Sequence, residues 1–456
     1  MLTRGAGLMA MMVALGTACA EPVFVVDGPD GEGEGEGEGE GEGEGEGEGE
    51  GEGEGEGGPL VDRPLQSTVT SVQPLTGIVL WEDSHNELAL KTEPGFIQLE
   101  YAYVTPGSIA VAEGVYDWTA FDDFLDRIAA RRHQAIVRFF DTYPGEESGV
   151  PGWIKARADY DETVGISEGL TTSFPDWRSP VLQQFMLDFF TVFAERYDDD
   201  PRLAYLQVGF GLWAEYHIYD GPNVVGEQFP SQAFQASFMR HLDAALDTLH
   251  WSISIDAGDD GYGPFQSTPA LLQLPFGLFD DSFMIEGHDG YNASMWDELG
   301  HDTRMLTSPA GGELSYASDF DQAHALDVGG MYGRTFEALA RQYALTYMLG
   351  NDQPDHHSDA RIKAAGMAIG YRFRITALRT NGQRAEVDVE NIGIAPIAYD
   401  AFIAVDGVRS STSLRDLLPG QRHTMRVAAG SATPTLAIAC DRLVPGQVIG
   451  FDADLR

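Results

Sequence analysis

The chain is poor in cysteine. Its 456 residues include only Cys19 and Cys440, so the network of disulfide bonds typical of small secreted domains is excluded. A zinc site built from several thiolates is excluded for the same reason. Cys440 lies in the apolar run LAIAC, which predicts a buried core position.

Basic residues are also scarce. The chain has 28 lysines and arginines against 72 acidic residues, and its net charge at pH 7 is −44. A surface this acidic repels phosphate backbones, anionic lipids and polyanionic polysaccharides. We therefore expect no nucleic-acid partner, and among carbohydrate partners we expect neutral glycans.

Motifs that mark several common enzyme classes are absent. The sequence contains no G-x-x-x-x-G-K-[ST] phosphate loop and no G-x-S-x-G nucleophile elbow, which argues against P-loop NTPases and α/β-hydrolases. The histidines show no spacing typical of a catalytic metal site. We interpret His356 and His357, in a loop rich in proline and aspartate, as surface residues, and we expect neither a cofactor nor a metal.

The first twenty residues have the features of an export signal. Arg4 precedes a short apolar run at 8–15, and small residues follow; this pattern is too short to span a bilayer permanently. Signal peptidase could cut after Ala20, or Cys19 could be lipidated within an imperfect lipobox. Both alternatives predict a protein outside the cytoplasm, either secreted or periplasmic, or held at the cell surface by a lipid on Cys19.

Residues 21–63 are predicted to be a linker. Glycine and glutamate alternate without interruption from 31 to 57. Ordering glycine is costly and the like charges repel, so no packed structure is expected there. The tract could tether a lipid-anchored body, or it could be a low-complexity repeat without a selected role.

Between residues 64 and 370, apolar strand-like runs alternate with amphipathic helices, the pattern of a parallel α/β fold. About eight such units occur, which predicts a (β/α)₈ TIM barrel with loop insertions. The strands are expected at 77–82, 96–104, 134–140, 203–210, 251–257 and 282–286, with the seventh reaching Glu313 and the eighth within 336–349.

After residue 370 the apolar period changes to two. Tyr371, Phe373 and Ile375 alternate with polar neighbours, and pairs such as Asn381-Gly382 mark turns. Residues 371–456 are therefore predicted to form a small antiparallel β-sandwich.

Acidic residues lie where several predicted strands end, and in a TIM barrel the working residues gather at this face. Glycoside hydrolysis needs two carboxyl groups, one protonated and one ionised. We assign these roles to Glu215, after strand four, and Glu313, after strand seven. Aromatic neighbours would raise the pKa of Glu215 toward that of a usable acid, and two glycines before Glu313 would let a short loop approach a ligand. The remaining strand-end acids are Glu82, Glu100, Asp256 and Glu286.

Further side chains at these strand ends are predicted to contact substrate. An arginine could orient the strand-seven carboxylate by a charge-assisted hydrogen bond, or form a structural ion pair inside the barrel mouth. The tryptophans could stack on sugar rings or serve packing, and the histidines could assist or be structural. The predicted set is Arg138, Trp81, Trp213, Tyr216, His217, His288 and Asp289.

Several segments resemble known families. Residues 115–118 through Arg138 resemble the second helix and the next strand of clan A glycosidases, including β-galactosidases. The segments at 175–180 (PDWRSP), 196–198 (RYD), 211–217, 312–313 and 370–373 (GYRF) resemble the bacterial family named domain of unknown function 4832. Members of that family are similar to glycoside hydrolases, with a barrel and a C-terminal sandwich.

The resemblance implies that Glu215 is the acid/base and Glu313 the nucleophile, by analogy with retaining clan A enzymes. Those enzymes usually carry asparagine immediately before the acid/base glutamate, where it binds the sugar 2-hydroxyl, whereas this chain has Ala214. Two hypotheses follow. The protein is a retaining hydrolase of a neutral glycan, or it is a non-catalytic carbohydrate-binding or surface-adhesion protein on the same barrel.

Overall fold

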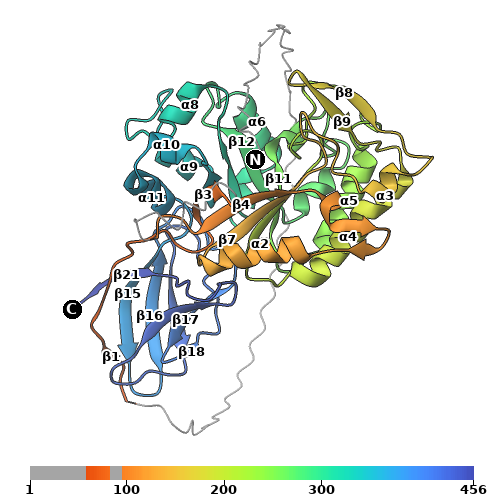
Figure 1. Ribbon diagram of the computed structural model, residues 1–456. Helices are drawn as coiled ribbons and strands as arrows, with labels where there is room; N and C mark the ends of the chain where they lie inside the picture. Colours follow the sequence, from red (N-terminus) through yellow and green to blue (C-terminus); the bar gives the residue numbers. More distant parts are fainter. Residues whose placement is uncertain (1–57, 83–94) are drawn as a thin grey trace, which may run out of the picture.

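Eight parallel strands close into a barrel in the computed structural model, which describes residues 58–82 and 95–456 (Figure 1). Each barrel strand pairs in parallel with the next along the chain, and the last pairs with the first. The predicted TIM barrel is confirmed. Its strands are β3 (Gly77–Trp81), β4 (Leu99–Val104), β7 (Gln134–Phe139), β10 (Leu203–Val208), β11 (Trp251–Ser254), β12 (Gly277–Phe283), β13 (Ala310–Leu314) and β14 (Tyr347–Leu349).

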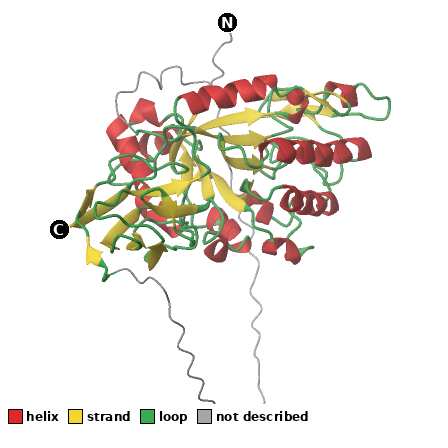
Figure 2. Ribbon diagram, turned by 90° about the horizontal axis from the view of Figure 1, so that it is seen from below, coloured by secondary structure: helices red, strands yellow, loops and turns green. Residues whose placement is uncertain are grey.

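Helices cover the outside of the barrel (Figure 2). The longest, α4 (Pro180–Tyr197), begins where its sequence predicts: the Ser179 hydroxyl accepts from the Leu182 amide at 3.3 Å, and proline occupies the first turn. Its Phe189 ring lies 5.1 Å from the Phe139 ring of β7. Burying such a side chain stabilises the fold by about 1.5–3 kcal/mol.

The other helices around the barrel are shorter. They are α1 (Pro106–Ile109), α2 (Thr119–Ala130), α3 (Gly152–Lys155), α5 (Gln232–Ala245), α6 (Tyr291–Glu298), α7 (His301–Arg304), α8 (Asp319–His324), α9 (Phe336–Gln342), α10 (Gln353–His356) and α11 (Asp359–Met367), with 3-10 turns η3 (Ile255–Gly258) and η4 (Pro269–Gln273). Two hairpins insert between barrel strands, namely β5 (Ala110–Ala112) with β6 (Val115–Tyr116) and β8 (Thr163–Ser167) with β9 (Leu170–Phe174).

The sixth barrel strand lies earlier in the chain than predicted. The prediction placed it at 282–286, whereas β12 is Gly277–Phe283 and contains two consecutive aspartates that read as a break in the apolar run. Asp280 is fully buried, and its carboxylate accepts hydrogen bonds from Asn292 Nδ2 at 2.8 Å and Trp296 Nε1 at 3.0 Å. Hydrogen bonds offset the cost of burying a charged group.

The C-terminal region holds two packed sheets. One has the order β19-β16-β15-β21-β2, and the other is β18-β17-β20. Both contribute to one apolar cluster, which includes Phe373, Val387 and Ile403. All neighbours in these sheets are antiparallel except β15 and β21, which are parallel. The strands are β15 (Phe373–Thr380), β16 (Ala385–Asn391), β17 (Ala401–Val405), β18 (Val408–Arg409), β19 (Arg422–Val427), β20 (Leu436–Cys440) and β21 (Phe451–Leu455).

The first described strands join the C-terminal sheet. Strand β1 (Val61–Asp62) pairs with β15, and β2 (Leu65–Ser67) pairs with β21. The sequence prediction had placed these residues at the end of the linker and the start of the barrel. The predicted export signal, Cys19 and the Gly-Glu tract lie outside the described residues. Across the ranges that the structure describes, no helix is long and apolar enough to cross a membrane.

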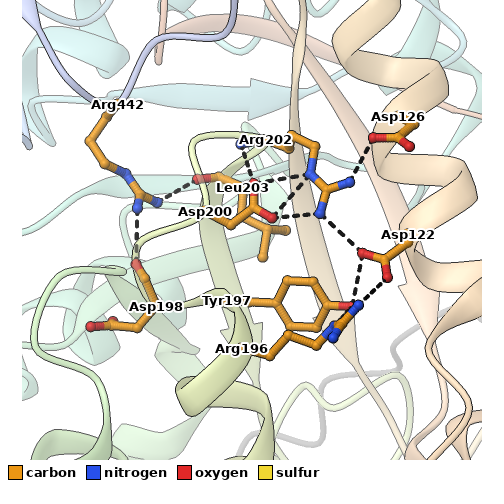
Figure 3. Close-up of polar contacts among 9 residues, drawn as sticks. All are labelled: Asp122, Asp126, Arg196, Tyr197, Asp198, Asp200, Arg202, Leu203 and Arg442. Carbon is orange, nitrogen blue, oxygen red and sulfur yellow. Dashed lines mark hydrogen bonds and ion pairs between the residues drawn. The ribbon is translucent and has the colours of Figure 1, made fainter.

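The C-terminal region packs against the end of the barrel where the strands begin (Figure 3). The Arg442 guanidinium donates to the Asp198 carbonyl at 2.9 Å and the Leu203 carbonyl at 2.8 Å. The Gln134 amide donates in turn to the Arg442 carbonyl at 2.6 Å, and the Tyr399 hydroxyl donates to the Ala204 carbonyl. These contacts leave the opposite end, where the strands finish, uncovered by the sheets.

We predict that Arg442→Met lowers the free energy of unfolding by about 2–4 kcal/mol, because two backbone carbonyls lose their donor. Urea denaturation followed by tryptophan fluorescence measures the change. The matched control is Arg426→Met, whose side chain is 83% exposed and should cost less than about 0.5 kcal/mol. Equal effects of the two substitutions would contradict the role given to Arg442.

Candidate active site

One buried arginine lies at the centre of the barrel mouth. Arg138, on β7, is 1% exposed. Its Nε donates to Gln207 Oε1 at 2.7 Å, its Nη1 to Glu215 Oε1 at 3.1 Å and its Nη2 to Asp281 Oδ1 at 2.6 Å. A buried charge is stable only when it is compensated, so this guanidinium holds strands three, four and six in one arrangement.

The predicted contact between Arg138 and the strand-seven carboxylate is not observed. The remaining hydrogen bonds of the guanidinium go to the Tyr103 hydroxyl and the Trp213 carbonyl, and none within the described residues reaches Glu313. The alternative drawn from the sequence, an ion pair inside the barrel mouth, is what the structure has.

The loop after β10 holds Glu215 in a conformation that the backbone rarely adopts. The φ angles of Trp213, Ala214 and Tyr216 are 53°, 63° and 62°. Positive φ is unfavourable for residues with a side chain, and such strain persists only where the surroundings fix it. Here the Trp213 amide donates to the Thr142 carbonyl at 2.9 Å, and the Tyr216 amide to the Phe210 carbonyl at 2.9 Å. The loop therefore directs Glu215 toward the mouth, and its backbone hydrogen bonds offset the conformational strain.

Burial raises the pKa of Glu215 well above its ordinary value. The neighbouring charges of Asp281, Glu313 and Asp256 add to this effect, while the Arg138 guanidinium opposes it. The sequence prediction attributed the raised pKa to aromatic crowding. The structure adds that carboxylates from three further strands contribute, so the group favours its protonated form.

Glu313 lies on β13 and its carboxyl group has no hydrogen-bond partner among the described residues. Burial, followed by the charge of Asp281, raises its pKa to about 8. The two preceding glycines are required for close packing, and their predicted role in the approach of a ligand stays a prediction. A Cβ at Gly311 would lie 2.2 Å from the Tyr347 ring, and one at Gly312 would lie 2.0 Å from the Asp280 carbonyl oxygen.

Asp281 is a third carboxylate of the site that sequence reasoning missed. Its Oδ1 accepts from Arg138, while its Oδ2 is buried and has no partner in the described residues. Its pKa is raised, first by burial. The signal in the sequence was an aspartate pair inside an otherwise apolar run, and the misplaced sixth strand concealed it.

His217 and Asp256 form a pair beside Glu215. His217 Nδ1 lies 2.6 Å from Asp256 Oδ2, and its Nε2 lies 3.8 Å from Glu215 Oε2. The predicted position of His217 at the site therefore agrees with the geometry. The contact with Asp256 also fixes the orientation of the imidazole ring, so that its Nε2 edge is turned toward Glu215.

Aromatic rings cover the other side of the mouth. Trp81 and Tyr103 have ring centroids 4.9 Å apart, Tyr103 and Tyr143 6.3 Å, and Tyr143 and Trp213 6.0 Å. The row ends with Tyr219, 6.1 Å from Trp213. We call these five residues the aromatic row. They lie at or just after the ends of the first four barrel strands, whereas Glu215, Asp256, Asp281 and Glu313 lie at or just after the ends of strands four to seven. The mouth therefore has an aromatic side and an acidic side, which meet at strand four.

Three predicted substrate-binding residues do not reach the mouth. Tyr216 is fully buried and packs against Phe210, with ring centroids 5.7 Å apart. His288 is also fully buried, and its Nε2 lies 3.0 Å from Asp280 Oδ2. Asp289 lies on the surface in an ion pair with Arg334 at 2.6 Å. Their proximity in sequence to strand ends was misleading, because loop direction decides where a side chain points.

Two other strand-end acids face outward. Glu100 is buried against helix α2 and its flank, where Arg131 Nε donates to it at 2.7 Å and His133 Nδ1 lies 2.7 Å away. Glu82 pairs with Arg127 at 3.0 Å. In the ranges 58–82 and 95–456, no group of three or more histidine, cysteine or carboxylate side chains is arranged to hold a metal ion.

Several solved structures of glycosidases are similar to the chain. One is endo-glycoceramidase II from Rhodococcus sp., determined as a lactosyl–enzyme intermediate; it is 12% identical, covers 80% of this chain and 100% of its own, and has a TM-score of 0.38. Another is a glycoside hydrolase family 30 subfamily 8 xylanase from Clostridium acetobutylicum, which is 11% identical, covers 80% of this chain and 98% of its own, and has a TM-score of 0.35. An α-galactosidase from Thermus thermophilus is similar over 71% of this chain and 66% of its own, with 14% identity and a TM-score of 0.37.

No family model and no curated protein sequence matches the chain. Membership of domain of unknown function 4832 therefore stays a prediction. At these identities and TM-scores, a solved structure assigns no activity to this protein. We base the functional proposal on the residues of the site.

The raised pKa of Glu313 makes stability depend on pH. Between its ordinary pKa of 4.5 and about 8, the folded protein binds more protons than the unfolded chain, so stability falls as pH rises. Glu313→Gln should remove this loss. We expect the variant to match the native protein near pH 4 and to exceed its free energy of unfolding near pH 8.5, on the order of 2 kcal/mol after allowance for solvent screening. A constant difference across this range in urea titrations would refute the assignment.

Proposed function

We propose that the protein is a glycoside hydrolase that acts on a neutral glycan outside the cytoplasm. The observation that carries the proposal is the carboxyl pair Glu215 and Glu313 at the barrel mouth, both with raised pKa values, together with the aromatic row, whose Trp213 shares a loop with Glu215. Carboxyl groups with proton affinities shifted by their surroundings are the machinery of glycoside hydrolysis. Aromatic faces bind the apolar faces of sugar rings.

In this mechanism Glu215 protonates the leaving oxygen and Glu313 attacks the anomeric carbon. Burial and neighbouring carboxylates keep a proton on Glu215, as a general acid requires. Attack needs the ionised form of Glu313, which the charge of Arg138 and the positive charge developing on the sugar both favour. Water then hydrolyses the glycosyl–enzyme with Glu215 as base, which retains the anomeric configuration.

The charge of the site supports a neutral substrate. Four carboxyl groups and one guanidinium face the mouth, so an anionic sugar would be repelled. Export to the cell exterior is part of the proposal and rests on the N-terminal sequence alone, with secretion and a lipid anchor at Cys19 as its two forms.

One observation favours the second candidate, a non-catalytic carbohydrate-binding or surface-adhesion protein. Ala214, at the position where retaining clan A enzymes carry asparagine, is fully buried and has a φ of 63°. A side chain at this position would point into the core and could not bind a sugar 2-hydroxyl. The site thus lacks one contact on which transition-state stabilisation in that clan depends.

Activity on a panel of p-nitrophenyl glycosides separates the two candidates. We expect slow cleavage by the native protein and a fall in kcat/KM of about 10²–10⁴-fold in Glu215→Gln and in Glu313→Gln. Asp126→Asn is the matched control, since this carboxylate lies at the other end of the barrel and is 69% exposed. Proton NMR of the first-formed sugar anomer tests retention.

Sugar binding without turnover of any glycoside would refute the hydrolase and favour the binding protein. Cleavage that survives both glutamine substitutions would instead refute the assignment of the carboxyl pair.

A further inference from the structure

The aromatic row continues beyond the carboxyl pair. From Trp213, two residues before Glu215 in the chain, it passes to Tyr143 on one side and Tyr219 on the other, at centroid distances of 6.0 and 6.1 Å. Trp213 and Tyr219 are nearly parallel, with an interplanar angle of 23°. Tyr143 and Tyr219 are 37% and 45% exposed. The outer part of the row is thus open to solvent while its inner end lies at the candidate active site.

The outer rings are held in place by contacts with their neighbours. The Trp213 and Tyr143 rings pack edge to face, with an interplanar angle of 81°. The Tyr219 hydroxyl donates to Glu168, in the turn of the β8–β9 hairpin, and the Glu168 amide donates to Asp220 Oδ2 at 2.6 Å. Rings fixed in advance lose little entropy when a ligand covers them. The Tyr219 hydroxyl is engaged at the edge of its ring, and the exposed parts of the Tyr143 and Tyr219 rings are left as contact surface.

Single exposed aromatic residues are common on protein surfaces and need no function. The outer rings, Tyr143, Trp213 and Tyr219, differ because they are adjacent and fixed in orientation, and because Trp213 and Tyr219 lie close in the chain to Glu215. The face of an aromatic ring is electron-rich and packs against the C–H groups on one face of a pyranose. Neighbouring centroids lie 6.0 and 6.1 Å apart, so a ligand that extends along the row would contact more than one ring.

We infer that Tyr143, Trp213 and Tyr219 bind further sugar units of a linear neutral oligosaccharide whose reacting unit lies at Glu215 and Glu313. This inference rests on the proposed function for the position of the reacting unit. It adds that the protein binds several sugar units of the oligosaccharide. Affinity should then rise with the length of the oligosaccharide, because longer ligands reach Tyr143 and Tyr219. A protein specific for one terminal sugar would gain nothing from these rings.

The test measures binding by isothermal titration calorimetry with the full chain carrying Glu313→Gln, so that hydrolysis does not interfere. The probes are gluco-, xylo-, manno- and galacto-oligosaccharides of one to five units. We expect affinity in at least one series to rise with length beyond two units. Equal affinity at every length, or no binding to any series, would overturn the inference.

Substitutions at the outer ring give the sharper comparison. Tyr219→Ala should weaken binding of the longest oligosaccharide about 2- to 10-fold and leave that of the monosaccharide unchanged. Tyr219→Phe keeps the ring and loses only the bond to Glu168, so it should retain most of the affinity. A loss of the same size for every chain length, or in Tyr219→Phe as in Tyr219→Ala, would refute a role for the ring face.

Failure of this inference is distinguishable from failure of the proposed function. Length-dependent binding with no cleavage by the native protein supports the aromatic row and refutes the hydrolase. Cleavage with a kcat/KM that is independent of chain length supports the hydrolase and refutes the row.

Discussion

The buried guanidinium of Arg138 is the constraint on which the candidate site depends. A charge with 1% exposure is tolerated only beside opposite charges and hydrogen-bond acceptors. Arg138 meets this requirement through Glu215 and Asp281, which come from different strands. The same contacts place two carboxyl groups close together, where the charge of Asp281 helps to raise the pKa of Glu215. The interaction that stabilises the barrel mouth therefore also sets its chemistry.

The strained loop that carries Glu215 shows how the surrounding structure supports this arrangement. Three residues with positive φ would be unstable in isolation, yet their backbone groups bond to Phe210 and Thr142 at the ends of neighbouring strands. Tyr216 anchors the loop from within the core. The unfavourable backbone conformation of this loop directs the Glu215 side chain toward the barrel mouth.

The two ends of the barrel have different roles. Arg442 and Tyr399 attach the C-terminal sheets where the barrel strands begin, and this end contributes stability. The other end has an aromatic side and an acidic side that meet at strand four, because rings lie at the ends of the first four strands and carboxylates at the ends of strands four to seven. A ligand between the two sides can stack one face of a sugar and present its glycosidic oxygen to the acids.

The sequence by itself determined the barrel and its approximate strand positions, and it named Glu215 and Glu313 as candidates, because hydrophobic periodicity and strand ends are local properties of the chain. Only the tertiary structure decided which acids face the mouth. Asp281 became visible once β12 paired with β13, since a shift along a strand exchanges inward and outward side chains. Tyr216 and His288 were misassigned because the direction of a loop depends on backbone bonds to distant residues. Arg138 likewise could be named from its strand, but its partners depend on how strands far apart in the sequence meet.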